Sequence, residues 1–419
     1  MSKFIIKGGK PLKGKIKPCG SKNAALPIIA ATLLAKEPCV IENVPEITDV
    51  HILFEIIQKL GVKVKKIEPH KYQIDAKNII KTELDEDLVQ KLRASILLLG
   101  PVLSRKGEMK MPHPGGCIIG RRPVGTHFRA LEKLGVKISQ NKFLYIAKVK
   151  DKLKSNEIYL DEPSVTATEN VLMAASRIPN ETIIKYAACE PHIQDLGQFL
   201  IKMGAQIEGL GTNTIKVIGK EELKGANHTI ILDEIEIGTF TAAAIATKGD
   251  ILIKGVNQKY LDPILNKLEN MNVNFKIGAD FLHILPSKNL KSTRIQTAPW
   301  PGFPTDLQAP FCVVATQAKG TSLIHDWMYE RRFGYIDELI KMGAKITQCD
   351  PHRILVSGPN QLYGAQIASP DIRAGIALII AGLVAKGKTE IDNIELIERG
   401  YENIDERLRS LGADIKKIG

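Results

Sequence analysis

One arrangement of apolar and polar positions recurs six times along the chain. Each copy predicts an amphipathic helix that ends at a glycine or asparagine and is followed at once by a strand, as in EKLGVKI (132–138) and IKMGAKI (340–346). The punctuating residues are Gly61, Gly135, Gly204, Asn272, Gly343 and Gly412, separated by 68 to 74 residues. Both residue types tolerate the left-handed conformation that commonly ends a helix. One such passage is common in α/β proteins, whereas six at nearly constant spacing predict a repeated unit.

A second pattern lies upstream of the first. Small and apolar residues, then a turn and a strand, occupy 240–256, 311–327 and 378–394, and in weaker form 28–44. The two patterns together predict a βαβαββ unit, and six such units account for almost all of the 419 residues. The helix predicted over 374–385, AGIALIIAGLVA, is apolar on every side, which is typical of a helix that is buried all round. We therefore expect one helix of each unit to lie inside the fold.

Composition places the chain among ordinary globular proteins, with 44% hydrophobic and 25% charged residues. Its length favours two or three domains. The N-terminal residues lack the apolar core of a signal peptide, and no run reaches the roughly 18 apolar residues that span a bilayer, so we expect a cytoplasmic protein. The six cysteines contain no C-x-x-C pair, which indicates neither a zinc site nor a disulfide framework. Apart from Cys117, we expect them to be small buried residues.

The formal charge of +12 leaves two interpretations open. No block of five or more Lys and Arg occurs, so the charge predicts either a solvated surface or a basic cleft for a small polyanion. No dinucleotide-binding or P-loop motif is present, since GLGTN (209–213) lies between two strand-like runs and not at the start of a helix.

The loop 112–123, PHPGGCIIGRRP, places Cys117 on a segment whose prolines and glycines prevent regular structure. Arg121 and Arg122 should favour the thiolate and lower the thiol pKa from its free value of about 8.5. The pattern fits either a reactive thiol or a bystander cysteine on a loop.

Four further segments carry charged or capping residues. GSKNAA (20–25) offers Ser21 or Asn23 as a helix cap and places the Lys22 ammonium beside a helix N-terminus, which suits anions. The others are Asp306 in PGFPTDLQAP, Asp371 and Arg373 in SPDIRAGIAL, and Arg399 in IERGYENIDERL. Each segment taken alone is equally compatible with helix capping or with salt bridges along a helix face.

Taken together, these motifs resemble the UDP-N-acetylglucosamine 1-carboxyvinyltransferase family of enolpyruvyl transferases. The similarity runs through GSKNAALPI, ENVPEITDV, LRASILLLGP, PGGCIIGRRPV, EPHIQDLGQFLIKMGA, FPTDLQAP, DIRAGIALIIAGL and IERGYENIDERLRSLGA. It implies an inside-out α/β barrel, the enolpyruvyl transferase fold, with two domains of three βαβαββ units each. The implied domains are 21–230, which carries a lid loop with Cys117, and 1–20 plus 231–419, with the active site in the cleft between them.

The resemblance also implies an activity. The family transfers the enolpyruvyl group of phosphoenolpyruvate to the 3-hydroxyl of UDP-N-acetylglucosamine and releases phosphate, the first committed step of peptidoglycan precursor synthesis. It implies no cofactor or metal, no nucleic-acid or membrane partner, and leaves the oligomeric state open with a monomer favoured. Asp306 matches the base that deprotonates the sugar hydroxyl. Cys117 matches the thiol that protonates the methylene carbon, adds covalently to phosphoenolpyruvate and reacts with fosfomycin.

Lys22 and Arg399 complete the implied catalytic set with Cys117 and Asp306. The implied substrate-binding residues are Lys22, Asn23, Arg93, Arg122, Pro123, Val124, Ser164, Val165, Asp306, Met328, Asp371, Arg373 and Arg399. The chain departs from the family pattern at Thr48, Gly125, Thr126 and Glu162, which affects the expected nucleotide affinity and not the reaction.

Three other functions compete with this interpretation. A 5-enolpyruvylshikimate-3-phosphate synthase shares the implied fold but lacks the cysteine loop. An RNA 3'-phosphate cyclase would suit the positive charge but needs a nucleotidyl-accepting histidine, for which no motif is seen, and its RNA affinity would depend strongly on salt. A binding protein that kept the fold would have little reason to retain Cys117, Asp306, Lys22 and Arg399.

Overall fold

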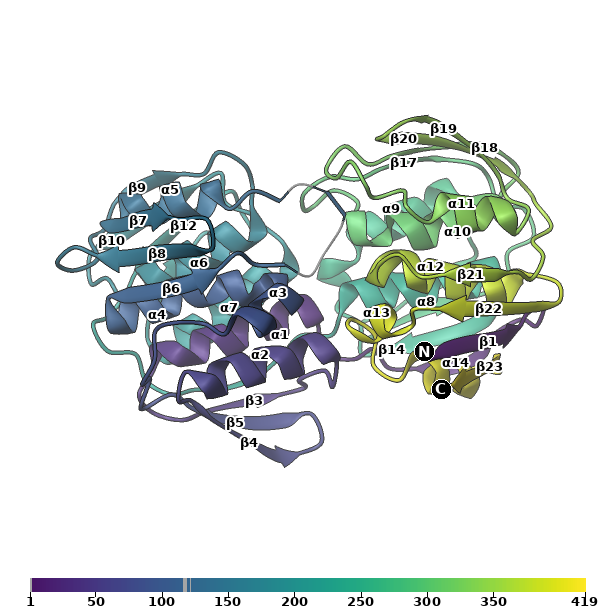
Figure 1. Cartoon of the computed structure of the whole chain (residues 1–419). Coiled ribbons are helices and arrows are strands. Elements are labelled where there is room, and N and C mark those ends of the chain that lie inside the picture. Colours follow the sequence, from purple (N-terminus) through teal and green to yellow (C-terminus); the bar gives the residue numbers. More distant parts are fainter. Residues whose placement is uncertain (1, 116–118, 121) are drawn as a thin grey trace. The chain divides into compact units, whose positions relative to one another are not determined.

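The computed structural model describes residues 2–115, 119–120 and 122–419 (Figure 1). The chain forms two compact units. The N-terminal unit comprises Gly20–Cys117 and Arg122–Ile231, and the C-terminal unit comprises Met1–Cys19, Ile118–Arg121 and Leu232–Gly419. Within the described ranges, no helix is long and apolar enough to cross a membrane.

The N-terminal unit contains three inner helices, α1 (Lys22–Ala31), α4 (Leu99–Lys106) and α6 (Val165–Ala175), with the 3₁₀ turns η1 (Thr32–Leu34) and η2 (Arg93–Leu98). Its other helices are α2 (Thr48–Lys59), α3 (Glu86–Lys91), α5 (Gly125–Lys133) and α7 (Pro191–Met203). Its strands are β3 (Cys39–Glu42), β4 (Lys63–Glu68), β5 (Lys71–Asp75), β6 (Glu108–Pro112), β7 (Val136–Gln140), β8 (Leu144–Val149), β9 (Glu157–Tyr159), β10 (Glu181–Lys185), β11 (Gln206–Glu208), β12 (Thr214–Ile218) and β13 (Asn227–Thr229).

The C-terminal unit repeats this plan with the inner helices α8 (Glu234–Ala246), α10 (Gln308–Gln317) and α12 (Ile372–Val384). Its other helices are α9 (Asp262–Asn270), α11 (Ile336–Lys341), α13 (Glu395–Glu398) and α14 (Ile404–Ser410), with the 3₁₀ turns η3 (Gln258–Tyr260) and η4 (Thr305–Leu307). Its strands are β1 (Lys3–Lys7), β2 (Lys13–Ile16), β14 (Asp250–Lys254), β15 (Phe275–Ile277), β16 (Phe281–Ile284), β17 (Arg294–Gln296), β18 (Gly320–His325), β19 (Lys345–Asp350), β20 (Arg353–Gly358), β21 (Gln366–Ala368), β22 (Lys388–Asp392) and β23 (Asp414–Ile418).

The sheets share one topology, which confirms the predicted repeat. In the described part of the chain, five sheets have four strands in orders such as β13-β3-β5-β4 and β17-β18-β20-β19. Each begins with a parallel pair and continues with two antiparallel pairs. The sixth sheet, β6-β8-β7, has three strands, and a parallel bridge between Glu83 and Lys110 stands where its fourth strand would pair. The first two strands of the chain belong to the C-terminal unit, since β1 pairs with β22 and β23 and β2 pairs with β14.

The predicted helix stops are also confirmed. The glycines at 61, 135, 204, 343 and 412 all have φ between +91° and +115°, and Asn272 has φ +56°. Each lies directly between an outer helix and the strand that follows it. The left-handed conformation ends the helix and turns the chain into the strand, and a β-branched residue there would be strained.

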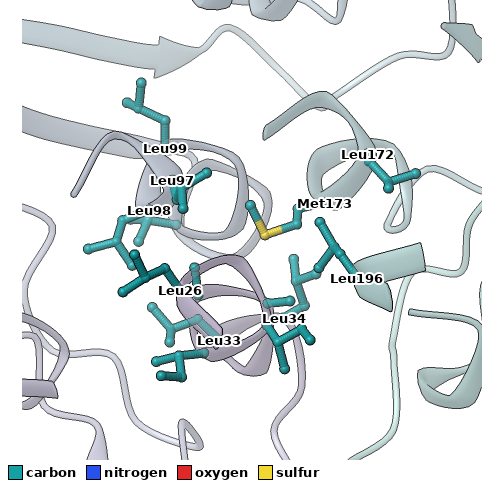
Figure 2. Packing of buried hydrophobic residues seen from close by; sticks show 14 of the residues in the cluster. Leu26, Leu33, Leu34, Leu97, Leu98, Leu99, Leu172, Met173 and Leu196 are labelled. Atoms are coloured by element: carbon teal, nitrogen blue, oxygen red, sulfur yellow. The ribbon is translucent and has the colours of Figure 1, made fainter. Parts of the chain in front are cut away.

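Buried helices form the core of each unit. Every residue of α8 is buried, as is every residue of α12 from Arg373 to Leu383, which confirms the helix predicted to be buried all round. In Figure 1 the helices α8, α10 and α12 lie between the sheets of the C-terminal unit. Figure 2 shows the corresponding packing in the N-terminal unit, where Leu26, Leu97, Leu172 and Leu196 come from four different elements. Each fully buried leucine stabilises the fold by about 1.5–3 kcal/mol.

The inner helices of the N-terminal unit run in the same direction. Arg105 of α4 donates to the carbonyls of Leu33 and Ala35, at 2.9 and 2.6 Å, which follow α1. Arg177, just after α6, donates to the carbonyl of Ser104 at 2.6 Å. These guanidinium groups satisfy carbonyls at the ends of the helices, where positive charge is favoured. The C-terminal ends of the three helices therefore lie together.

Five cysteines fall in the described ranges, and none forms a disulfide there. Cys39 and Cys312 are buried as expected, whereas Cys19 and Cys189 are half-buried. Cys349 is exposed, so the expectation of burial is wrong for this residue. It lies on β19, in which Thr347, Gln348 and Cys349 are all exposed.

Candidate functional site

Lys22 is the first residue of α1 in the N-terminal unit. Ser21 caps this helix, since its hydroxyl accepts from the Ala24 amide at 3.4 Å. The Lys22 Nζ lies 3.1 Å from the Asp49 Oδ2, and the two side chains are 13% and 4% exposed. Asn23 follows and is half-buried. The residues place an ammonium group at a helix N-terminus, where the helix dipole also favours anions.

Arg93 begins η2 and binds two separate backbone carbonyls. Its guanidinium donates to the Pro114 carbonyl at 3.3 Å and to the Arg122 carbonyl. Arg93 therefore holds the chain on both sides of the segment that contains Cys117. Cys117 and Arg121 themselves lie outside the described residues.

His127 connects this segment to the start of α6. The buried imidazole lies on α5, with its Nε2 2.8 Å from the Thr166 hydroxyl oxygen. Burial, reinforced by the positive charges of Arg93 and Arg122, lowers the pKa of His127 to about 3. The ring is therefore neutral at physiological pH and acts as a hydrogen-bonding spacer rather than as a cation.

The remaining predicted residues of this unit flank that connection. Ser164 caps α6 by accepting from the Ala167 amide at 3.4 Å, and Val165, the first residue of the helix, is half-buried. Pro123 is exposed and Val124 is buried directly before α5. The structure thus brings the 122–124 segment, Arg93 and the N-terminus of α6 into one neighbourhood.

Two positions at which the sequence departs from the family pattern contact each other. The buried Thr126 donates its hydroxyl to the Glu162 Oε1 at 3.4 Å, while Glu162 itself is exposed. Gly125 is the first residue of α5, and Thr48 is an exposed residue at the start of α2.

Asp306 is the centre of a polar cluster in the C-terminal unit. It lies on η4, directly ahead of α10. Arg332 donates to its Oδ1 at 2.5 Å and Arg373 donates through Nε to its Oδ2 at 2.9 Å. The two arginine side chains are 4% and 5% exposed, whereas the Asp306 side chain is 26% exposed. Two guanidinium groups therefore stabilise the ionised form of a carboxylate that solvent can still reach.

Arg373 is held from several sides. Asp371 caps α12, because its Oδ1 accepts from the amides of Arg373 and Ala374 at 2.8 and 3.0 Å. The Arg373 guanidinium lies 5.3 Å from the centre of the Tyr401 ring, a distance that suits a cation–π contact. Burial alone would lower the pKa of Arg373, but Asp306 and other neighbours raise it above its ordinary value, so the group keeps its charge.

The other two predicted residues of this unit lie on separate segments. Met328 is half-buried in the turn after β18, and Arg399 is half-buried immediately after α13. Among the ranges that the structure describes, no group of three or more His, Cys, Asp or Glu could hold a metal ion.

Sequence reasoning missed Arg332, Asp49 and Tyr401. Arg332 follows Arg331 in the turn 330–335, where two adjacent arginines are easily read as surface charge. Asp49 lies in ENVPEITDV, a motif that by itself assigns no role to its carboxylate. Burial is what distinguishes all three residues, and the type of a charged or polar residue does not report its burial.

Comparison with known proteins gives concordant matches. A family model described as EPSP synthase (3-phosphoshikimate 1-carboxyvinyltransferase) matches residues 6–408. The UDP-N-acetylglucosamine 1-carboxyvinyltransferase of Halothermothrix orenii is 46% identical over 100% of both chains. The protein of the same name from Treponema denticola is 43% identical over 99% of each chain.

Solved structures show the same fold. The enolpyruvyl transferase NikO from Streptomyces tendae matches 99% of this chain and 98% of its own, with a TM-score of 0.90 and 26% identity. An EPSP synthase from Acinetobacter baumannii matches 100% of both chains with a TM-score of 0.77 and 19% identity, which shows a shared fold alone.

Proposed function

Because the chain belongs to the UDP-N-acetylglucosamine 1-carboxyvinyltransferase family, we propose that it transfers the enolpyruvyl group of phosphoenolpyruvate to the 3-hydroxyl of UDP-N-acetylglucosamine and releases phosphate. The observation that carries the proposal is the accessible, ionised carboxylate of Asp306 between two buried arginines. This arrangement suits a general base, which must be deprotonated before it reacts and must be held in a fixed direction.

In the proposed reaction, Asp306 removes the proton from the 3-hydroxyl as the oxygen attacks the second carbon of phosphoenolpyruvate. The Cys117 thiol protonates the methylene carbon, so that a tetrahedral ketal with a methyl group forms. Loss of a proton from that methyl group and of phosphate from the neighbouring carbon restores the double bond. The Cys117 thiolate can also add to the second carbon of phosphoenolpyruvate while the methylene carbon takes a proton from solvent, which gives a covalent adduct.

Phosphoenolpyruvate carries nearly three negative charges, so its binding needs several cations. Lys22, Arg122 and Arg399 are the proposed phosphate and carboxylate ligands, with Arg93 and Arg373 in supporting positions. The Lys22 ammonium at the start of α1 supports this role, since helix N-termini favour anions. Arg93 already donates to two backbone carbonyls, which supports a role in holding the chain beside the proposed phosphate and carboxylate ligands.

The nucleotide sugar is the proposed ligand of a second set of residues. This set comprises Asn23, Pro123, Val124, Ser164, Val165, Met328 and Asp371. The capped N-terminus of α6 supports the assignment of Ser164 and Val165, because backbone amides there can donate to a diphosphate.

The proposed cellular context rests on the relatives of the chain. The relatives that share the chain's full length come from bacteria and bear the name of one peptidoglycan-precursor enzyme. We propose that the chain acts in the bacterial cytoplasm as a monomer, contributes to cell-wall formation, cell shape and cell division, and is a target of fosfomycin.

Phosphate release from phosphoenolpyruvate tests the activity directly. The rate is compared with UDP-N-acetylglucosamine, with shikimate 3-phosphate and with no acceptor. We expect release that depends on the nucleotide sugar alone. Release with shikimate 3-phosphate alone would instead assign the chain to the EPSP synthases, and release without an acceptor would contradict transfer.

A further inference from the structure

Asp326 is a fully buried carboxylate that follows β18 in the C-terminal unit. Both its backbone amide and its backbone carbonyl form hydrogen bonds with His352. The Asp326 amide donates to the His352 carbonyl at 2.9 Å, and the Asp326 carbonyl accepts from the His352 Nδ1 at 2.7 Å. His352 lies in the turn between β19 and β20, and β20 pairs with β18. The position of Asp326 is therefore set by the sheet.

The two oxygens of Asp326 bind two different segments. Its Oδ2 accepts from the Thr305 hydroxyl at 2.5 Å, and Thr305 is the residue before Asp306 on η4. Its Oδ1 accepts from the Met328 amide at 3.1 Å. One carboxylate thus fastens the turn that carries Asp306 and the turn that carries Met328 to the same point of the sheet.

A buried carboxylate is costly unless hydrogen bonds and a nearby cation compensate for its lost hydration. The two hydrogen bonds supply part of this compensation, and Arg332 supplies positive charge. Burial opposes the charge of Arg332, but Asp306, Asp371 and Asp326 together raise its pKa. Arg332 donates directly to Asp306, and a change at Asp326 reaches the Asp306 turn through the Thr305 hydroxyl.

We propose that Asp326 is a positioning residue that fixes the direction of the Asp306 carboxylate through Thr305 and the place of the Met328 segment through its backbone amide. This inference rests on the proposed function, in which Asp306 is the base and Met328 contacts the nucleotide sugar. Asp326 would then hold both the base and part of the acceptor site, so that one residue aligns the acceptor hydroxyl with the base.

Thr305→Val tests the link to the base. Valine has nearly the shape of threonine but lacks the hydroxyl, whereas the control Thr305→Ser keeps it. Misplacing a reacting group by about 1 Å can cost about a hundredfold in rate, so we expect kcat to fall by about ten- to a hundredfold in Thr305→Val. The KM for phosphoenolpyruvate should stay within about twofold of the wild-type value, because KM reflects binding of the substrate in the ground state and the change affects the position of the base. Thr305→Ser should restore most of kcat.

Asp326→Ala tests the anchor itself. Alanine offers no acceptor to the Thr305 hydroxyl or to the Met328 amide, whereas asparagine would keep a hydrogen bond with Thr305 by donating its amide group to the hydroxyl oxygen. We expect a kcat loss at least as large as that of Thr305→Val, because the Met328 segment is released as well. The double variant should lose little more than Asp326→Ala alone, since both single changes remove the hydrogen bond between Thr305 and Asp326. Rates are calculated per binding-competent molecule, with the concentration set by calorimetric titration with UDP-N-acetylglucosamine.

Wild-type kcat in Thr305→Val, or equal losses in Thr305→Val and Thr305→Ser, would overturn the inference. Additive losses in the double variant would show that the two residues act separately and would also overturn it. These outcomes differ from failure of the proposed function, in which the wild-type protein itself would release no phosphate with UDP-N-acetylglucosamine.

Discussion

Replacing Glu169 with glutamine should stabilise the protein, and more so as the pH rises. Glu169 lies on the inner helix α6 and is 1% exposed. Among the described residues, no group donates a hydrogen bond to its Oε1. Burial raises the pKa of Glu169 from 4.5 to about 8, with His192 lowering it and Glu190 raising it. The side chain is therefore a neutral acid in the folded protein near pH 7.

The magnitude follows from proton linkage. Below pH 4.5 the folded and unfolded states both hold the proton, so the group contributes no pH dependence. Between pH 4.5 and 8 the unfolded chain loses the proton while the folded chain retains it, so the free energy of unfolding falls as pH rises. Each pKa unit corresponds to about 1.4 kcal/mol, which gives a maximum loss of roughly 5 kcal/mol above pH 8. Between pH 5 and pH 8 the loss is about 3–4 kcal/mol.

Urea unfolding of wild type and Glu169→Gln at several pH values measures this difference. Glutamine has the same shape and does not titrate, so the variant should gain about 3–4 kcal/mol relative to wild type between pH 5 and pH 8. Glu132→Gln, on the exposed face of α5, controls for the change in net charge and should show a flat difference. A flat difference for Glu169→Gln as well, or one that grows toward low pH, would refute the reasoning.

Three further predictions concern the site. Fosfomycin should add to wild type and not to Cys117→Ser, as read by intact mass, and an adduct on the exposed Cys349 would contradict the assignment. Asp306→Asn should abolish phosphate release while nucleotide-sugar binding by calorimetry persists; retention of more than about a tenth of kcat would exclude Asp306 as the base. The His127 pKa of about 3 means that only the unfolded chain takes up a proton as pH falls below 6.5. His127→Gln should therefore gain about 2 kcal/mol relative to wild type between pH 7 and 5 in denaturant titrations, and an unchanged difference would contradict burial of the neutral ring.

Local patterns predicted the fold to a large extent. The left-handed residues at 61, 135, 204, 272, 343 and 412 end their helices as expected, because that conformation depends mainly on the residue itself. The apolar surface of α12 likewise predicted its burial, since a helix without a polar face cannot lie on the surface. The incomplete sheet β6-β8-β7 was not predicted, because a missing edge strand depends on what pairs across the sheet.

The candidate site was predicted unevenly for the same reason. Asp306 and Arg373 were identified by their motifs, but their direct contact joins residues 67 positions apart. Sequence patterns did not predict Arg332 or Asp326, because their burial and their hydrogen bonds form only when distant turns meet. The roles of Cys117 and of the proposed substrate ligands remain predictions from family resemblance.

The sequence by itself determined the repeated unit, its helix stops, its buried helices and the family, because each depends on residue types at short and regular spacing. The tertiary structure decided which charges are paired. Whether a carboxylate is a cap, a base or an anchor depends on the cations and donors that folding brings within about 3 Å of it, and those partners come from remote parts of the chain. Asp306 with its two arginines and Asp326 with its two turns show this difference in the same unit.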